Sequence, residues 1–553
     1  MRNFVLMNRF LLSAIFLLSG LSLTAQRNGN RNAEIARNLE IFDDIYKQLD
    51  AYYVDTLSAD TAIQWAIEGM LSRVDPFTNY FPEDNDDLRQ LATGKYAGIG
   101  STIRLSKREQ RAVISEPYEG TPSQQAGLKA GDIILSVDGK DVKGLPLAQV
   151  TQMLRGEAGT TFELRVRRPG EDKPLSFRIT RRTIQLPSVP YYGMQADGLG
   201  YLYLTGFTSG TALEVRRALQ DLKAQGMRSL VLDLRGNPGG ALDEAVNIVN
   251  LFVPKGRRVV YTRGKVPSVN REYYTVSEPL DTITPMVVLV DGWSASSAEI
   301  VSGSLQDMDR AVVMGTRTYG KGLVQSIREL PYRGNLKITV SRYYIPSGRC
   351  LQAYDYRHLK PDGSVGTVPD SLTRVFRTLA GREVRDGGGV NPDVLASPDS
   401  LPSFVYDLVA SEEMFDYVTR YAREHSRIAP AADFGVTDEE YADFARHMQE
   451  SGFVANRRSE AVMKLLKEAA RLEGYYEPAR AEFEALEARL NNDLQSDLLR
   501  LRNEVKPYLN AEIVSRYYYQ RGTCQQQLKR DKVYEQAAAL LADRAEYDKI
   551  LRP

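Results

Sequence analysis

The sequence predicts a multidomain α+β protein, and three observations lead to this fold class. The chain has 553 residues, a length that suits roughly three or four domains. Its hydrophobic periodicity changes along the chain, from helical to short β-rich runs, then to alternating strands and helices, then back to helical. Its composition is globular, with 43% hydrophobic and 26% charged residues. We therefore expect an N-terminal helical segment, a β-rich domain, an α/β core and a C-terminal helical region.

Residues 1–25 have the features of a secretory signal peptide. Arg2 and Arg9 supply positive charge, the run from Phe10 to Leu23 is nearly all apolar, and the small residue Ala25 ends the segment. The apolar run is short for a transmembrane helix. We predict a cleaved signal peptide and a periplasmic or secreted mature protein, with an uncleaved membrane anchor as the alternative.

Residues 26–93 are expected to form a helical region. A second helix near Ala62–Leu71 should stop before Asp75-Pro76, because the residue preceding a proline disfavours helical geometry. The first helix is indicated by apolar residues at helical spacing, with charged residues opposite. These apolar residues are Ile35, Leu39, Ile41, Ile45, Leu49 and Tyr53.

Residues 94–183 have the pattern of a β-rich domain. A glycine loop, Gly98-Ile99-Gly100, leads into its first strand. Successive N–H groups of such a loop can bind a terminal carboxylate, and the strand edge beside it can add an extended peptide. The expected strands are Ser101–Leu105, Arg111–Ser115, Asp132–Val137, Thr161–Val166 and Leu175–Thr180, with short helices at Pro122–Ala126 and Pro146–Leu154.

Residues 184–395 alternate strands with helices, which is typical of an α/β core. A strand over Leu199–Leu204 is followed by a helical pattern, and the apolar runs Ser229–Leu234 and Met286–Val290 suit buried strands. Ligands of such cores gather at the carboxyl ends of the strands. The turn N-P-G-G at 237–240 follows one of these runs, so we expect the functional site beside it.

A serine-rich turn follows the last of these buried strands. Residues 294–299 read S-A-S-S-A-E, and a helical pattern opens directly behind Ser296. Small neighbours let a substrate carbonyl approach a hydroxyl, and the free N–H groups of a helix N-terminus can face a developing oxyanion. Lys321, farther along between two glycines, can serve as the base for that hydroxyl. The alternative interpretations are a helix cap for the serine-rich turn and a surface turn for the Gly-Lys-Gly segment.

Together these motifs resemble the carboxyl-terminal processing proteases, also called tail-specific proteases, which are Ser/Lys serine peptidases that carry a PDZ domain. The resemblance covers about residues 33–395. It includes A-G-L-K-A-G-D-I-I-L-S-V-D-G-K at 126–140, typical of a PDZ domain, and L-D-L-R-G-N-P-G-G at 232–240. It implies that the β-rich domain is a PDZ domain and that the α/β core is a serine protease. A purely structural β-domain is the alternative for the PDZ groove.

The resemblance assigns catalytic roles to individual residues. The family's nucleophile stands three residues before a glutamate, and Ser296 stands three before Glu299, with Ser297 as the alternative nucleophile. Lys321 corresponds to the general base. Gln325, expected one helical turn beyond it, corresponds to the glutamine that orients this lysine.

The expected oxyanion hole consists of backbone amides. One belongs to Ser297, next to the nucleophile, and the second to Gly239 or Gly240 of the N-P-G-G turn. Asp307 matches an aspartate found in some members, and we interpret it as structural, with a supporting catalytic role as the alternative. A Ser-His-Asp triad is not expected, because no histidine stands at a strand-end motif of the core. The three histidines are His358, His425 and His447.

Composition and the C-terminal region limit the remaining functions. The 71 basic and 71 acidic residues give a net charge of +0, which gives no support for a nucleic-acid-binding protein. Two distant cysteines, Cys350 and Cys524, and three scattered histidines offer no metal site, and we do not expect a disulfide. Residues 396–553 read as charged helices without a chemical motif, suited to packing or oligomer contacts.

The sequence thus predicts a secreted serine endopeptidase that needs no cofactor. Its substrates would be proteins or peptides with apolar C-terminal tails, bound at the loop Gly98-Ile99-Gly100 and cut through an acyl-enzyme intermediate. An adaptor protein, and a homo-oligomer formed through the helical regions, are two further partners to consider. The alternatives are a non-catalytic PDZ scaffold on a protease-like fold and, less favoured, a tricorn-like or retinoid-binding relative.

Overall fold

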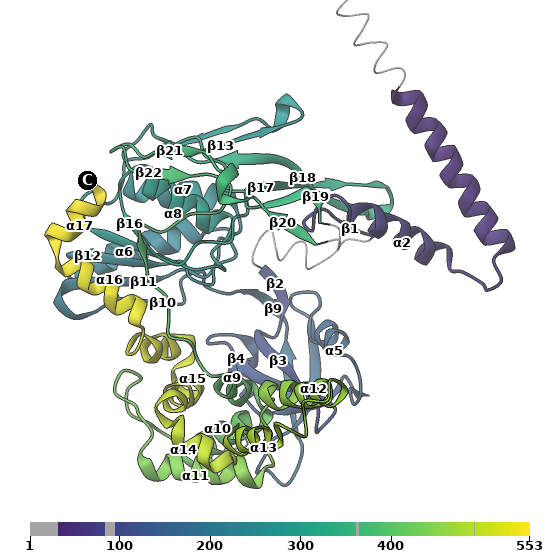
Figure 1. Ribbon diagram of the computed structural model, residues 1–553, viewed down its shortest axis with the longest axis vertical. Coiled ribbons are helices and arrows are strands. Elements are labelled where there is room, and N and C mark those ends of the chain that lie inside the picture. Colours follow the sequence, from purple (N-terminus) through teal and green to yellow (C-terminus); the bar gives the residue numbers. More distant parts are fainter. Residues whose placement is uncertain (1–30, 83–94, 361–363, 491–492, 553) are drawn as a thin grey trace, which may run out of the picture. The chain divides into compact units, whose positions relative to one another are not determined.

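A computed structural model describes residues 31–82, 95–360, 364–490 and 493–552 (Figure 1). The expected signal peptide lies outside the described residues. The chain divides into two compact units, one of Met1–Pro82 with Ile327–Ile338 and one of Glu83–Ser326 with Thr339–Pro553. Within the described ranges, no helix combines the length and the apolar character needed to cross a bilayer.

The described part of the smaller unit contains two α-helices, the strand β1 and the segment Ile327–Ile338, which holds the end of one strand and the beginning of another. Residues 31–52 form a helix, and α2 follows over Ala59–Leu71. Strand β1 (Asn79–Phe81) then pairs antiparallel with the beginning of β18 (Asn335–Tyr344). Both helices occur where the apolar periodicity predicted them.

The β-rich domain has the predicted order of strands. Its sheet runs β3-β4-β5-β7-β8, with β6 beside β5, so β3 is an edge strand. Side chains on β7 alternate between buried and exposed, as expected for a sheet with one face on the core. Helix α5 (Leu147–Leu154) packs against β3, and β2 (Lys95–Gly98) pairs with β9 (Arg182–Gln185). The remaining elements are β3 (Ser101–Ser106), β4 (Arg111–Pro117), α4 (Pro122–Gln125), β5 (Ile133–Val137), β6 (Lys140–Asp141), β7 (Thr161–Arg167) and β8 (Leu175–Thr180).

The α/β core is built on a six-stranded sheet of order β10-β11-β12-β15-β16-β23. Only β10 runs antiparallel to its neighbour, and the other pairs are parallel. One face of the sheet packs on α6 (Thr211–Ala224), α7 (Leu242–Phe252) and α8 (Ser297–Asp307). The strands are β10 (Tyr191–Met194), β11 (Leu199–Tyr203), β12 (Ser229–Asp233), β15 (Met286–Val290), β16 (Val312–Gly315) and β23 (Val394–Leu395).

The C-terminal helices cover the other face of this sheet. The end of α15 (Arg502–Leu528), together with α16 (Lys532–Ala542) and α17 (Arg544–Leu551), buries apolar side chains against alternate residues of β12, β15 and β16 (Figure 1, yellow). The Tyr547 hydroxyl bonds both the N–H and the carbonyl of Met286, each at 2.9 Å. The six-stranded sheet is therefore sandwiched between two helical layers, one of which comes from the C-terminus.

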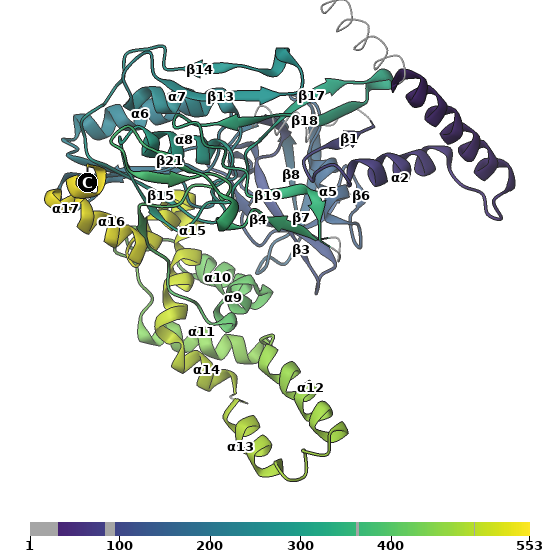
Figure 2. The same ribbon diagram turned by 45° about the horizontal axis from the view of Figure 1, so that its top comes forward.

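A second sheet contributes strands near the functional site. Strand β18 pairs with β13 (Arg258–Gly264), which pairs with β14 (Glu272–Tyr274), and β17 (Leu323–Glu329) also joins β18. Figure 2 shows these strands side by side. Two short hairpins follow, β19 (Tyr354–Leu359) with β20 (Val365–Thr367), and β21 (Val375–Arg377) with β22 (Glu383–Arg385).

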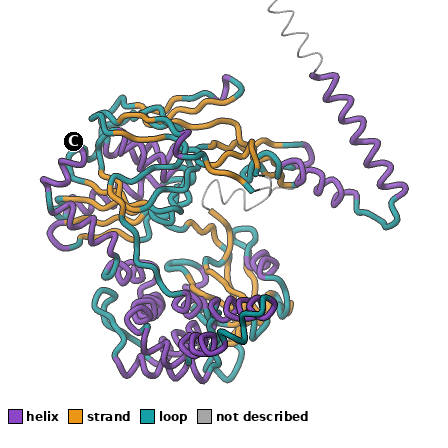
Figure 3. The backbone as a smooth tube through the Cα atoms, in the orientation of Figure 1, coloured by secondary structure: helices purple, strands orange, loops and turns teal. Residues whose placement is uncertain are grey.

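Beyond Leu395 every described regular element is a helix, as predicted (Figure 3). Most of these helices share one apolar core. Helices α12 and α13 lie side by side, joined by an ion pair between Lys467 and Glu487 (Figure 2). The helices before α15 are α9 (Ser403–Ala410), α10 (Glu412–Glu424), α11 (Asp438–Glu450), α12 (Arg458–Leu472), α13 (Arg480–Leu490) and α14 (Leu494–Arg500).

Candidate active site

Ser296 occupies a sharp turn between β15 and α8. Its backbone has φ 54° and ψ −112°, a positive φ that L-residues rarely adopt. Such a conformation costs about 1–3 kcal/mol and is concentrated at functional sites. Asp291 shapes the approach to the turn, because its Oδ1 accepts the N–H groups of Trp293 (2.9 Å) and Ser294 (3.0 Å). The turn leaves Ser296 half-buried at the N-terminus of α8.

The other serines of this segment have structural bonds. The Ser297 hydroxyl donates to the Gly240 carbonyl at 2.9 Å, and its side chain is buried. The hydroxyls of Ser294, Ser302 and Ser304 likewise donate to backbone carbonyls in the core. These bonds favour Ser296 over Ser297 and the others as the nucleophile.

Glu299 ties the nucleophile segment to the lysine segment. Its Oε2 accepts the backbone N–H groups of Ser296 (2.8 Å) and Lys321 (2.9 Å). Its Oε1 accepts the N–H of Gly320 (2.7 Å) and the hydroxyl of Thr318 (2.6 Å). Burial raises the pKa of Glu299 to about 7, although these donors act in the opposite direction. One buried carboxylate thus fixes the backbones of both predicted catalytic residues.

Tyr343, on β18, bridges the same two segments. Its hydroxyl lies 2.6 Å from the carbonyl oxygen of Lys321 and 3.3 Å from that of Ser296. The side chain is only 1% exposed, and burial raises the pKa of its hydroxyl well above the ordinary value, so it remains a donor. Ser296 and Lys321 are therefore linked twice, through their N–H groups and through their carbonyls.

Lys321 needs a glycine on each side for steric reasons. A Cβ on Gly320 would collide with the side chain of Ala353, and one on Gly322 would lie 2.7 Å from the backbone nitrogen of Gln352. The Gly320 carbonyl accepts the Ala353 N–H at 2.9 Å, which fixes the loop. The Gly-Lys-Gly motif therefore places a half-buried lysine in a loop that packs closely on a neighbouring segment.

Gln325 lies on strand β17, so the expected helical turn after Lys321 is wrong. The strand forms because residues 323–329 join β18 in a sheet, and this pairing overrides the local pattern. The Gln325 amide Nε2 donates to Thr339 Oγ1 on β18 at 3.2 Å. A glutamine on a paired strand still provides a fixed amide near the lysine loop.

The predicted oxyanion turn lies directly against Ser296. A Cβ on Gly239 would lie 2.8 Å from Ser296 Cβ and 2.9 Å from the Ser297 nitrogen, so this close approach requires glycine. The Gly239 N–H donates to Asn237 Oδ1 at 2.9 Å. Of the two candidate glycines, Gly240 is therefore the better donor for an oxyanion, together with the N–H of Ser297 at the start of α8.

Comparison with known proteins identifies the family. Three family models match: a PDZ domain over residues 113–168, Peptidase family S41 over 198–365, and a probable PDZ-protease C-terminal helical domain over 404–541. A carboxy-terminal-processing protease of Bartonella bacilliformis is 36% identical over 346 residues, which are 62% of this chain and 78% of that protein. The chain belongs to the carboxy-terminal-processing proteases of family S41.

Other relatives carry similar descriptions. A probable CtpA-like serine protease of Staphylococcus epidermidis is 32% identical over 67% of this chain and 75% of its own length. The solved photosystem II D1 C-terminal processing protease is 27% identical, covers 65% of this chain and 93% of its own, and has a TM-score of 0.36. As an S41 member with a PDZ domain, the chain is a serine-type peptidase.

The remaining titratable candidates of this S41 protease lie away from Ser296. Asp307, at the opposite end of α8, forms a fully buried ion pair with Arg349 (2.9 Å) and accepts the Ser347 N–H. A helix of this length places it about 16 Å from Ser296. His425 and His447 bond backbone carbonyls of the C-terminal helices, and the side chain of His358 lies outside the described residues.

Cysteines and metal ligands do not extend the S41 site. Both Cys350 and Cys524 are free, and burial raises the pKa of Cys524 to about 12. No three His, Cys, Asp or Glu side chains gather as a metal site among the residues that the structure describes.

The PDZ glycine loop directs its carbonyls inward. The Ile99 carbonyl accepts the Ser123 N–H at 2.8 Å, and the Gly100 carbonyl accepts the hydroxyls of Thr121 (2.8 Å) and Ser123 (2.7 Å). Because a trans peptide points its N–H opposite its carbonyl, the amides of Gly100 and Ser101 face away from these partners. Gly100 has φ +72°, and a Cβ there would collide with Thr121. The predicted loop thus presents consecutive N–H groups, as an anion-binding turn does.

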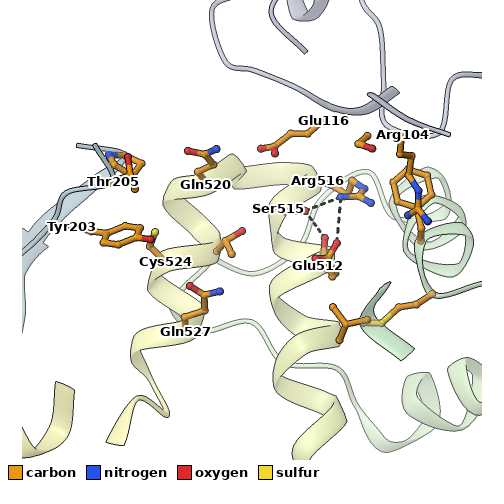
Figure 4. A pocket seen from close by; sticks show the side chains of 16 residues that line it. Arg104, Glu116, Tyr203, Thr205, Glu512, Ser515, Arg516, Gln520, Cys524 and Gln527 are labelled. Atoms are coloured by element: carbon orange, nitrogen blue, oxygen red, sulfur yellow. Dashed lines mark hydrogen bonds and ion pairs between the residues drawn. The ribbon is translucent and has the colours of Figure 1, made fainter. Parts of the chain in front are cut away.

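Two cavities lie near these elements. One, of about 450 Å³, is lined by the PDZ strands, the protease core and α15 (Figure 4). There Arg516 bonds the Ser515 hydroxyl at 2.8 Å and lies 3.8 Å from Glu512. The other, of about 410 Å³, includes Tyr319 and Tyr354. Because Tyr319 is two residues before Lys321, the second cavity is the one beside the candidate catalytic loop.

Sequence reasoning missed the two bridging contacts. Glu299 served only to select Ser296 among the serines. The spacing S-x-x-E is the signature of a capping box, however, and could have predicted the bond to the Ser296 N–H. Tyr343 has no local signal, because it approaches Ser296 through strand pairing in the second sheet.

Proposed function

We propose that this S41 member is a secreted serine endopeptidase that cleaves protein substrates near their C-terminus, with Ser296 as nucleophile and Lys321 as general base. The observation that carries the proposal is the double bridge between the two residues. Glu299 binds both backbone N–H groups, and Tyr343 contacts both carbonyls. A constellation held this closely suits groups that must act together on one substrate atom. The expected signal peptide supports secretion.

The chemistry follows from the placement of donors and acceptors. The neutral Lys321 amine accepts the proton of Ser296 as its Oγ attacks the scissile carbonyl, and only the neutral form can do this. The N–H groups of Ser297 and Gly240 donate to the oxyanion that develops. Lys321 then returns the proton to the departing amine, and water hydrolyses the acyl-enzyme by the same route. Gln325 orients the lysine.

The PDZ domain is proposed to hold the substrate tail. The terminal carboxylate would accept the N–H groups that Gly100 and Ser101 turn away from the domain. The preceding residues of the tail would add as a strand to the open edge of β3, beside α5. The cavity at Tyr319 and Tyr354 offers two tyrosine rings against which a substrate side chain near the scissile bond could pack.

The test uses purified protein and an unfolded substrate that ends in an apolar tail. Wild type and Ser297→Ala should cleave it, and Ser296→Ala should not. Amidation of the tail should weaken processing, because the glycine loop loses its carboxylate ligand. Cleavage by Ser296→Ala would contradict the proposed nucleophile. Absence of cleavage by wild type across a panel of tails would favour a non-catalytic PDZ scaffold.

Self-association is proposed to involve the helix of residues 31–52. Its residues Ile35, Leu39, Phe42, Tyr46 and Leu49 repeat at alternating intervals of four and three, a heptad seam that two copies of one helix can share. Substituting Leu39 by Glu should therefore shift the chain to a lower oligomeric state in light scattering, and an unchanged mass would contradict this role. The exposed members are Ile35 (47%), Leu39 (63%), Phe42 (44%) and Leu49 (42%).

A further inference from the structure

Arg235 stands at the joint between strand β12 and the proposed oxyanion turn. Its neighbours on both sides bond the nucleophile segment. The Leu234 carbonyl accepts the Ser294 hydroxyl at 2.8 Å, and the Gly236 N–H donates to Asp291 Oδ1 at 3.0 Å. A backbone shift at Arg235 would therefore displace both the oxyanion turn, residues 237–240, and the segment that carries Ser296.

Two carboxylates hold the Arg235 side chain. On one side, its Nε and Nη2 donate to Asp233 at 2.9 and 2.5 Å. On the other, Nη1 and Nη2 donate to the two oxygens of Asp531 at 3.1 and 2.5 Å. The pairing with Asp531 is bidentate, the geometry that fixes a guanidinium in orientation as well as in position. The pKa of Arg235 is raised by these partners against the opposing effect of burial, so it stays charged.

Asp531 is itself held rigidly. Its Oδ1 accepts the N–H groups of Val533 and Tyr534, both at 3.0 Å, so it caps the N-terminus of α16. Helix α16 is anchored on the protease sheet through the buried side chains of Val533, Ala537 and Leu541. The carboxylate is therefore a fixed point that the C-terminal helical layer presents to Arg235.

We propose that Asp531 is a positioning residue for the protease site, through which the C-terminal helices orient the oxyanion turn. This inference rests on the proposed function of Ser296 and the turn. The two partners of Arg235 differ in what they can fix. Asp233 is two residues away on the same strand end, and its Oδ2 also accepts the Tyr201 hydroxyl of β11 at 2.8 Å, so it fixes Arg235 within the sheet itself. Asp531 belongs to a different layer of the fold, and it fixes that segment against the helices on the far face of the sheet.

Substitution by asparagine isolates this role. Asn caps a helix about as well as Asp, so Asp531→Asn should preserve α16 while it removes one charge-assisted half of the bidentate pair. Asp531→Ser is a second uncharged capping variant, for use if the first does not fold. Asp543→Asn is the matched control, because Asp543 caps the next helix, α17, by accepting the Glu546 N–H at 3.1 Å. Activity is expressed per active site by burst titration, so an unfolded fraction does not count.

We expect kcat of Asp531→Asn to fall about tenfold with KM changed less than about twofold, because full loss of an oxyanion donor costs about 10²–10³ and misplacement costs part of that. The affinity for a peptide aldehyde, which mimics the tetrahedral intermediate, should fall by a similar factor. A purely structural role would lower the melting temperature and leave both values unchanged. Equal kcat and aldehyde affinity in the Asp531 variants and the Asp543→Asn control would overturn this inference. An inactive wild type, or an active Ser296→Ala, would instead overturn the proposed function.

Discussion

Replacing Tyr343 by phenylalanine removes one hydroxyl and leaves a buried ring in place. The hydroxyl is 2.6 Å from the Lys321 carbonyl and 3.3 Å from that of Ser296. Losing a short bond and leaving its acceptor buried costs about 1–3 kcal/mol, and the longer contact adds little. We therefore expect Tyr343→Phe to lower the free energy of unfolding by about 2 kcal/mol.

The catalytic effect should accompany this loss. The lost bond also lets Lys321 move away from Ser296. If this displacement raises the activation free energy by about 1.4 kcal/mol, kcat/KM falls about tenfold. The assay is steady-state cleavage of a peptide substrate, with denaturant unfolding of the same samples. Tyr344→Phe is the control, because the neighbouring residue points to the other side of β18 and stacks on Tyr261 at 5.0 Å. A kcat/KM for Tyr343→Phe within twofold of wild type and of Tyr344→Phe would refute the bridge as a functional contact.

Three other predictions concern the same site. Because burial raises the pKa of Glu299 from 4.5 to about 7, its charged form is disfavoured in the folded state. The free energy of unfolding should therefore fall by about 3 kcal/mol as pH rises from about 4.5 to 7. In urea unfolding, the free energy of unfolding of Glu299→Gln should lack this dependence on pH. Lys321→Ala and Lys321→Arg should both be inactive in the peptide assay, because arginine keeps the charge but cannot be deprotonated; near-wild-type turnover by Lys321→Arg would exclude the dyad. Gly239→Ala should lower kcat at least tenfold, because its Cβ would collide with the Ser296 turn, whereas Gly226→Ala, with open space around it, should leave kcat unchanged; equal kcat in the two variants would contradict the placement of the turn.

Much of the fold was predictable because its signals are local. The glycine loop, the N-P-G-G turn and the serine-rich turn are punctuated by small residues. The glycine loop leads into β3 as expected, and the other two turns follow β12 and β15 as expected. The spacing of Ser296 and Glu299 was also a usable local signal. The helical interpretation around Gln325 failed because residues 323–329 are a strand only through pairing with β18.

The contacts that bind the site together come from distant segments. Tyr343 reaches Ser296 from the second sheet, and Asp531 reaches Arg235 from the C-terminal helices. Neither residue stands in a motif, since a buried tyrosine and a helix-capping aspartate are ordinary in sequence. Likewise, nothing in the charged C-terminal sequence indicates that α16 and α17 cover one face of the protease sheet. Such roles depend on tertiary packing, which periodicity alone does not specify.

The most direct test of the account is to trap the acyl-enzyme. Wild type, Ser296→Ala and Lys321→Ala are mixed with an activated peptide ester, quenched in acid within the burst phase, digested and analysed by mass spectrometry. The account predicts that wild type carries the acyl group on the peptide containing Ser296, that Ser296→Ala carries none, and that Lys321→Ala acylates far more slowly. An acyl group on another residue, or undiminished ester turnover by Ser296→Ala, would contradict the central claim.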